Sequence, residues 1–326
     1  MAISVHNVQG KQQAAGVNRE IAGNFLLDDA IHAVLPAGYK VISADSYALS
    51  AWSVTARIAG EYTDGKRAQF FLKYATEDSG KAQLEGEFKA MSELFKIMPT
   101  LVPRPYACGK LQLQSPPTYF FLCEFLNISD SLPDPVKLGK SLSELHMRSV
   151  SPNGKFGFYL PTYDGRLPQI TDWESSWTSF FGKLLAGIHQ LDVDTNGPWK
   201  DLDDVIDRTL RYVIPRLLGV LESNGRTVKP CLIHGDLWEG NIGTESETGN
   251  LYIFDSCAYY AHNEMEIGIW RVNHHQLKAE VYRQEYLRNV EPSEPAEEWD
   301  DRNRLYSVKT MLMYSAHVPG SEVRKQ

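Results

Sequence analysis

The sequence predicts an α+β protein of two lobes, in which a small antiparallel β lobe with one helix precedes a larger, mainly helical lobe. Strand-like runs dominate residues 1–126, of which 1–20 form a polar, Gln-rich lead-in. A polar Asp/Ser/Pro stretch at 127–135 is typical of a linker, and helical periodicity dominates 136–326. A chain of 326 residues with 43% hydrophobic content is long and apolar enough for two packed lobes.

The first lobe is expected to open with a short helix and a hairpin. Residues 24–35 have apolar side chains at helical spacing, and Asn24 is a suitable N-cap. Two alternating runs, at 50–58 and 68–74, read as strands joined by a turn at Asp64-Gly65.

The remaining elements follow from the same patterns. An amphipathic helix is expected at 82–97, followed by strands at 106–113 and 118–125. Beyond the linker we expect helices at 136–147, 173–191 and 201–221, a long loop at 151–171, two short strands around a turn at 245–250, and further helices to the end.

Composition excludes several classes of protein. The net charge of −8 and the lack of Lys/Arg-rich runs argue against a nucleic-acid partner. No apolar run is long enough to span a membrane, and the N-terminus has no basic segment leading into an apolar one, so we expect no signal peptide. The four scattered cysteines suggest reduced thiols in a cytoplasmic protein rather than a disulfide framework.

The most informative segment is 233–241, followed by 251–255. Asp236 can accept the proton of a substrate hydroxyl, and Asn241, five residues later, can hold a metal ion. Asp255, at the end of an apolar run, can hold the same metal or another. The Asp-to-Asn spacing equals that of the protein-kinase catalytic loop, so the segment predicts an ATP- and Mg²⁺-dependent phosphotransferase.

Two residues of the first lobe fit this interpretation. Lys73 ends an apolar strand and Glu87 lies in the next helix, which is how kinase-like folds hold ATP phosphates. Glu85 competes as the partner of Lys73, but we prefer Glu87 because Met91 and Leu94 then share its packing face.

The Gly-rich loop that usually covers the phosphates is missing. Residues 43–52 carry side chains throughout, which limits close approach of the backbone, although Ser46 or Ser50 could add a hydroxyl. Glu124 and Leu126, just before the linker, are also assigned to nucleotide binding.

These motifs resemble the fructosamine/ketosamine kinases, within the aminoglycoside-phosphotransferase-like group. The loop His-Gly-Asp-Leu-Trp-x-Gly-Asn at 234–241 resembles the family signature. Its Trp238 distinguishes it from the corresponding loop of most aminoglycoside and choline kinases. Residues 255–264 resemble the family's Asp-Pro-Ala-x-Tyr-Tyr-Gly-His-x-Glu, with the Pro and a Gly replaced. Further similar segments lie at 84–87, 102–105, 155–158, 168–169 and 173–181.

The resemblance implies a protein-kinase-like fold and phosphorylation of the third-carbon hydroxyl of ketosamines, in the repair of glycated amines. The partner would be a small or protein-bound ketosamine, and we expect a monomer. Aromatic rings suit a sugar, so Trp238, Trp173 and Trp177 are candidate substrate contacts, as is His262. Packing in the core explains Trp173 and Trp177 equally well.

Two alternatives stay open. The chain could phosphorylate another small hydroxyl compound, such as an aminoglycoside, choline or a specialised metabolite. It could also be a pseudokinase that serves as a binding module, which the degraded phosphate loop favours and the clamp residues oppose.

Overall fold

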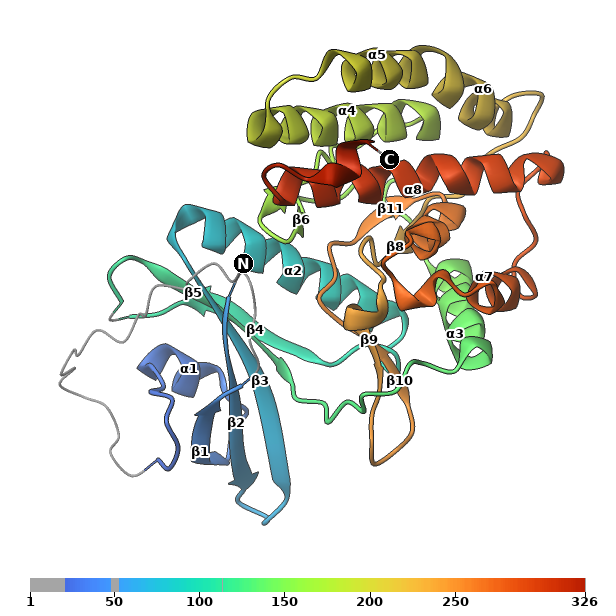
Figure 1. The fold of residues 1–326 in the computed structure, drawn as a ribbon. Helices are drawn as coiled ribbons and strands as arrows, with labels where there is room; N and C mark the ends of the chain where they lie inside the picture. The colour runs from blue at the N-terminus through green and yellow to red at the C-terminus, as the bar shows by residue number, and fades with distance from the viewer. Residues whose placement is uncertain (1–20, 48–52, 113, 326) are drawn as a thin grey trace.

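The computed structural model describes residues 21–47, 53–112 and 114–325. Its first part is a five-stranded sheet in which every pairing is antiparallel and the spatial order is β1-β2-β3-β5-β4 (Figure 1). The hairpin expected around Asp64-Gly65 joins β2 to β3, and Gly65 has a φ of +83° there. The strands are β1 (Tyr39–Ser46), β2 (Val54–Tyr62), β3 (Arg67–Thr76), β4 (Pro105–Lys110) and β5 (Thr118–Glu124).

Two helices cover opposite faces of this sheet. Strand side chains alternate between faces; accordingly, Phe120 and Leu122 of β5 pack with the helix α1 (Asp29–Val34). Phe121 and Cys123 pack instead with the helix α2 (Glu77–Ile97), which joins the core of the second lobe. Helix α2 therefore connects the sheet to the core of the second lobe.

The second part is mainly helical, as Figure 1 shows. Its long helices are α3 (Pro135–Arg148), α4 (Trp177–Asn196), α5 (Lys200–Arg208), α7 (Glu280–Leu287) and α8 (Trp299–His317). Shorter helices are η1 (Thr209–Val213), α6 (Ile214–Leu218), η2 (Gly219–Glu222), η3 (Glu239–Asn241), η4 (Asn263–Arg271), η5 (Gln276–Lys278), η6 (Ala296–Glu298) and η7 (Glu322–Lys325). Three two-stranded ribbons complete it: β6 (Tyr163–Asp164) with β7 (Leu167–Pro168), β8 (Cys231–Ile233) with β11 (Tyr259–Ala261), and β9 (Ile242–Thr244) with β10 (Leu251–Ile253).

Several predicted elements differ from the structure. Strand β1 was not predicted, and the first helix is capped by Asp28 rather than by Asn24, whose side chain accepts a hydrogen bond from Ser46 N. The helix expected from 173 begins at Trp177, because Ser176 caps it there. A π-helical turn, η1, interrupts the helix expected at 201–221. In the described part of the chain, no helix is both long and apolar enough to cross a membrane.

Candidate active site

An ion cluster joins the two parts of the molecule. Lys73 on β3 donates to Glu87 of α2 at 2.7 Å and to Asp255, just after β10, at 2.5 Å. Glu85 pairs with Lys81 instead, at 3.9 Å. Burial alone would lower the pKa of Lys73, but Asp255 and Glu87 raise it, so Lys73 is a cation. Burial raises the pKa of Glu87 to about 7 despite Lys73.

The backbone conformation of Asp255 determines the direction of its side chain. Its φ of +59° places it in the left-handed region, which aspartate tolerates better than most residues. The pairing of β10 with β9 ends at Ile253, and the turn at Asp255 directs the chain out of this ribbon. The side chain of Asp255 is 46% exposed while that of Lys73 is 10% exposed, so a ligand can reach the carboxylate.

The loop of Asp236 folds around Asn241. The Asn241 Nδ2 donates to the backbone oxygen of Asp236 at 2.8 Å and to its Oδ2 at 2.9 Å. Gly235 has a φ of +86°, and a Cβ at this position would lie 2.7 Å from Cys257 O. The structure therefore explains why glycine replaces the arginine found here in protein kinases.

Hydrogen bonds with His234 and Glu266 stabilise the backbone of the Asp236 loop. Burial lowers the pKa of His234, so its ring is neutral. Its Nε2 donates to Phe254 O at 2.8 Å and its Nδ1 accepts from Asp236 N at 3.4 Å. The carboxylate of Glu266 on η4 accepts from His234 N and, at 3.1 Å, from Gly235 N. These bonds fix the backbone that presents Asp236.

Sequence reasoning missed two residues beside the base. Lys309 of α8 donates to Asp164 Oδ2 at 3.0 Å and to Gly235 O at 3.2 Å. Burial would lower the pKa of Lys309, but Asp164 raises it above its ordinary value. Burial, and after it the charge of Asp164, raise the pKa of Asp236 to about 8, while Lys309 opposes the rise. The sequence signal for Lys309 was a charged residue among the buried positions of the helix α8.

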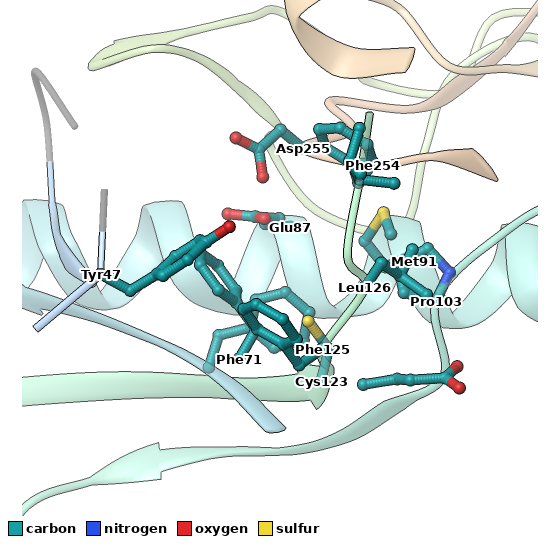
Figure 2. A pocket seen from close by; sticks show the side chains of 13 residues that line it. Tyr47, Phe71, Glu87, Met91, Pro103, Cys123, Phe125, Leu126, Phe254 and Asp255 are labelled. Carbon is teal, nitrogen blue, oxygen red and sulfur yellow. The ribbon is translucent and has the colours of Figure 1, made fainter. Parts of the chain in front are cut away.

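A cavity of about 240 Å³ lies between the sheet and the second lobe (Figure 2). Glu87 and Asp255 contribute carboxylates to its wall, and most other lining side chains are apolar. Tyr47 enters it, with its ring 4.9 Å from that of Phe125 and 6.1 Å from that of Phe71. An apolar cavity with a few polar groups at one side suits a nucleotide base and its phosphates.

The predicted nucleotide contacts are partly brought together here. Glu124 and Leu126 line the cavity, although one Glu124 carboxylate oxygen accepts from Arg104 N at 3.2 Å. Among the described residues, Tyr47 lines it and Ser46 does not. Ser50 lies outside the described residues.

Of the predicted substrate contacts, Trp238 is accessible, whereas packing explains Trp173. Trp238 is 36% exposed beside the base, with its ring 5.6 Å from that of His275. Trp173 packs between Tyr159 and Tyr260, with ring centroids 5.7 and 5.9 Å away, which explains it without a ligand.

The assignment of Trp177 and His262 to substrate binding is wrong. Trp177 is fully buried and donates to Tyr306 OH at 2.8 Å. His262 is 1% exposed, and its ring nitrogens bond Tyr306 OH and Ser293 Oγ, each at 2.9 Å. Neither side chain has a surface that a substrate could touch, because both belong to the core around α8.

The two predicted metal ligands fit Mg²⁺. Asn241 uses its amide nitrogen on Asp236, which turns its carbonyl oxygen away from that bond, and Asp255 offers an accessible carboxylate. Magnesium takes oxygen ligands, commonly one or two from the protein with the rest from phosphates and water. In the described residues, no group of three His, Cys, Asp or Glu side chains could hold a metal by itself.

The two-lobed fold brings Lys73, Glu87 and Asp255 together, next to the loop of Asp236 and Asn241. The sequence model of the fructosamine kinase family matches residues 51–325. The chain belongs to the fructosamine kinase family, as its loop motif predicted.

Individual proteins are similar to this chain in sequence or in fold. The chain is 33% identical over 200 residues to the chloroplastic protein-ribulosamine 3-kinase of Oryza sativa subsp. indica, covering 61% of this chain and 55% of that protein. A crystal structure assigned to the fructosamine-3-kinases, from Haemophilus somnus 129PT, shares the fold, with a TM-score of 0.69 and 18% identity over 91% of this chain and 92% of that one. The structure of an aminoglycoside phosphotransferase with ADP and hygromycin B bound has a TM-score of 0.53 and 14% identity, over 84% of this chain and 85% of that one. The chain thus spans little more than half the length of its curated plant relative.

Proposed function

We propose that this chain is an ATP- and Mg²⁺-dependent ketosamine kinase that phosphorylates the third-carbon hydroxyl of fructosamine- or ribulosamine-type adducts. The observation that carries the proposal is the convergence of Lys73, Glu87 and Asp255 at an apolar cavity, next to the loop of Asp236. Phe254 N donates to Asn241 O at 3.0 Å, which ties that loop to the residue before Asp255. Phosphoryl transfer depends mainly on positioning and charge neutralisation, which such a cluster supplies.

Each residue has a role in this proposal. Lys73, held by Glu87, would bind the phosphates of ATP, while Asp255 and Asn241 would hold Mg²⁺. Bound Mg²⁺ would neutralise charge on the phosphates. Asp236 accepts the proton of the acceptor hydroxyl as that oxygen attacks the γ-phosphorus, whose bond to the β,γ-bridging oxygen breaks to release ADP. The exposed ring of Trp238 forms an apolar floor for the sugar.

The printed names of the relatives support the acceptor class. The family is named for fructosamine and the rice relative for ribulosamine, and both are ketosamines. Nucleotide use is supported by the ADP bound in the aminoglycoside phosphotransferase of similar fold. We further propose a reducing compartment, such as the cytoplasm, because all four cysteines are free thiols.

An acceptor panel tests the proposal. The purified chain with MgATP is offered fructosyl-lysine, ribulosyl-lysine, kanamycin and choline, and acceptor-dependent ADP release is measured. We expect turnover with the two ketosamines only. Turnover with kanamycin or choline in their place would support the alternative small-molecule kinase, and MgATP binding without any turnover would support a pseudokinase.

A further inference from the structure

The β6–β7 ribbon brings a second carboxylate to the catalytic base. Asp164 ends β6 and is held in place from α8 by two bonds: Lys309 Nζ lies 3.0 Å from its Oδ2, and His317 Nε2 lies 2.9 Å from its backbone oxygen. The same Lys309 ammonium bonds Gly235 O at 3.2 Å, directly before Asp236. One buried cation therefore connects the ribbon to the loop that carries the base.

Exposure decides which of these groups a ligand can reach. The side chain of Lys309 is 4% exposed and that of Asp164 is 16% exposed. An acceptor entering beside Asp236 therefore meets the carboxylate, while the ammonium stays behind it. Lys309 uses Oδ2 of Asp164, which directs its bond away from Oδ1.

The charge balance favours a cation in the acceptor. Asp164 and Asp236 share the charge of Lys309, while Asp255 is paired with Lys73 at 2.5 Å, so two carboxylates face one cation. A bound cation beside Asp164 would offset this excess by pairing with the Asp164 carboxylate. A neutral acceptor would leave the excess in place.

Ketosamines carry such a cation at a suitable place. Their amine nitrogen is attached to the first carbon and is protonated near neutral pH, while the reacting hydroxyl is on the third carbon. Three carbon atoms separate the two groups, so an acceptor whose hydroxyl lies on Asp236 places its ammonium within reach of a neighbouring side chain.

We propose that Asp164 is a specificity-determining residue, whose carboxylate binds the protonated amine of the acceptor while the acceptor hydroxyl lies on Asp236. This inference rests on the proposed function and adds to it the group that distinguishes a ketosamine from a neutral ketose. Lys309 acts as a positioning residue, because it holds Asp164 and the loop of Asp236 in one arrangement.

The test compares two acceptors that differ in one atom. Fructosyl-lysine is set against the ketose ether in which oxygen replaces that amine nitrogen, and kcat and KM are measured for both. A hydrogen bond to a charged group predicts a preference of about 10- to 100-fold in kcat/KM for the amine in the wild-type chain. Asp164→Asn should abolish this preference by raising KM for the amine, with little change for the ether.

Two further variants keep the test decisive. Asp164→Asn leaves Lys309 buried without its partner and could unfold the chain. The double variant Asp164→Asn/Lys309→Met removes both charges, and it should show the same loss of preference. Asp172→Asn, an exposed aspartate just beyond the same ribbon, is the matched control and should keep the wild-type preference.

The outcomes separate the two claims. Wild-type chain that phosphorylates both acceptors equally well would overturn the role of Asp164 and leave the proposed function standing. An equal loss on both acceptors in the folded variants would also overturn it, because Asp164 would then only position the loop. Wild-type chain that phosphorylates neither acceptor would overturn the proposed function and this inference together.

Discussion

Replacing Asp236 by asparagine tests the base without rebuilding its loop. The amide has nearly the shape of the carboxylate, so its oxygen can still accept the bond that Asn241 Nδ2 now makes to Oδ2 at 2.9 Å. The second bond, from Asn241 Nδ2 to the backbone oxygen of Asp236 at 2.8 Å, does not involve the side chain. The Asp236→Asn loop should therefore keep its conformation.

The expected loss of activity follows from the role of the base. Loss of a general base typically lowers turnover by about two to four orders of magnitude. Asp236 is not among the described residues that line the cavity proposed for the nucleotide, so the affinity for MgATP should change little. The change therefore separates catalysis from nucleotide binding.

Stability should change in the opposite direction. Burial and Asp164 raise the pKa of Asp236 to about 8, so the folded chain holds this proton more tightly than the unfolded chain does. Ionisation of Asp236 then destabilises the fold as pH rises from its ordinary pKa of about 4 to about 8. At pH 8, Asp236→Asn should be more stable than the wild type by about 1–4 kcal/mol, and this difference should vanish near pH 4.

The assay combines turnover, calorimetric MgATP binding and urea unfolding at pH 5 and pH 8. Asp130→Asn, an exposed aspartate of the linker, serves as the control and should leave all three unchanged. Near-normal turnover in folded Asp236→Asn would refute the assignment of the base. A stability difference that grew as pH fell would refute the assigned direction of the pKa change.

Three further predictions concern the surrounding residues. Asp255→Ala and Asn241→Ala should both raise the Mg²⁺ concentration needed for activity, Asp255→Ala more because it removes a charge; unchanged Mg²⁺ titrations would refute the metal assignment. Trp238→Ala should weaken acceptor use by about 1 kcal/mol and spare MgATP affinity, whereas an equal loss of both would make Trp238 a packing residue. Gly235→Ala should lower the free energy of unfolding by about 1–3 kcal/mol, because of its positive φ and the close Cys257 O; wild-type stability in urea would contradict this.

The sequence predicted the parts of the site that lie at the ends of recognisable elements. Lys73 ends an apolar strand, Glu87 shares a helix face with Met91, and Asp236 begins a loop of known spacing. The fold class followed from the same patterns and is confirmed by the solved structures of similar fold. Local periodicity and motif spacing are enough for such features, because each depends on residues close in the chain.

Features that depend on distant contacts were not predictable. Asp164 and Lys309 are 145 residues apart, and only the packing of α8 against the β6–β7 ribbon brings them together. The same limit explains the error at Trp177, since its spacing does not reveal whether the ring faces a cleft or Tyr306. Strand β1 was not predicted, because residues 43–52 occupy the place where a phosphate loop was expected.

The most direct test of the central claim is the identity of the product. The chain is incubated with MgATP and ribulosyl-lysine, and the phosphorylated carbon is assigned by ³¹P–¹H correlation NMR, with the Asp236→Asn variant in parallel. We predict a phosphate ester on the third carbon that forms with the wild-type chain and is at least about a hundredfold slower in the variant. A phosphate ester on another carbon, or equal rates in the two proteins, would contradict the account.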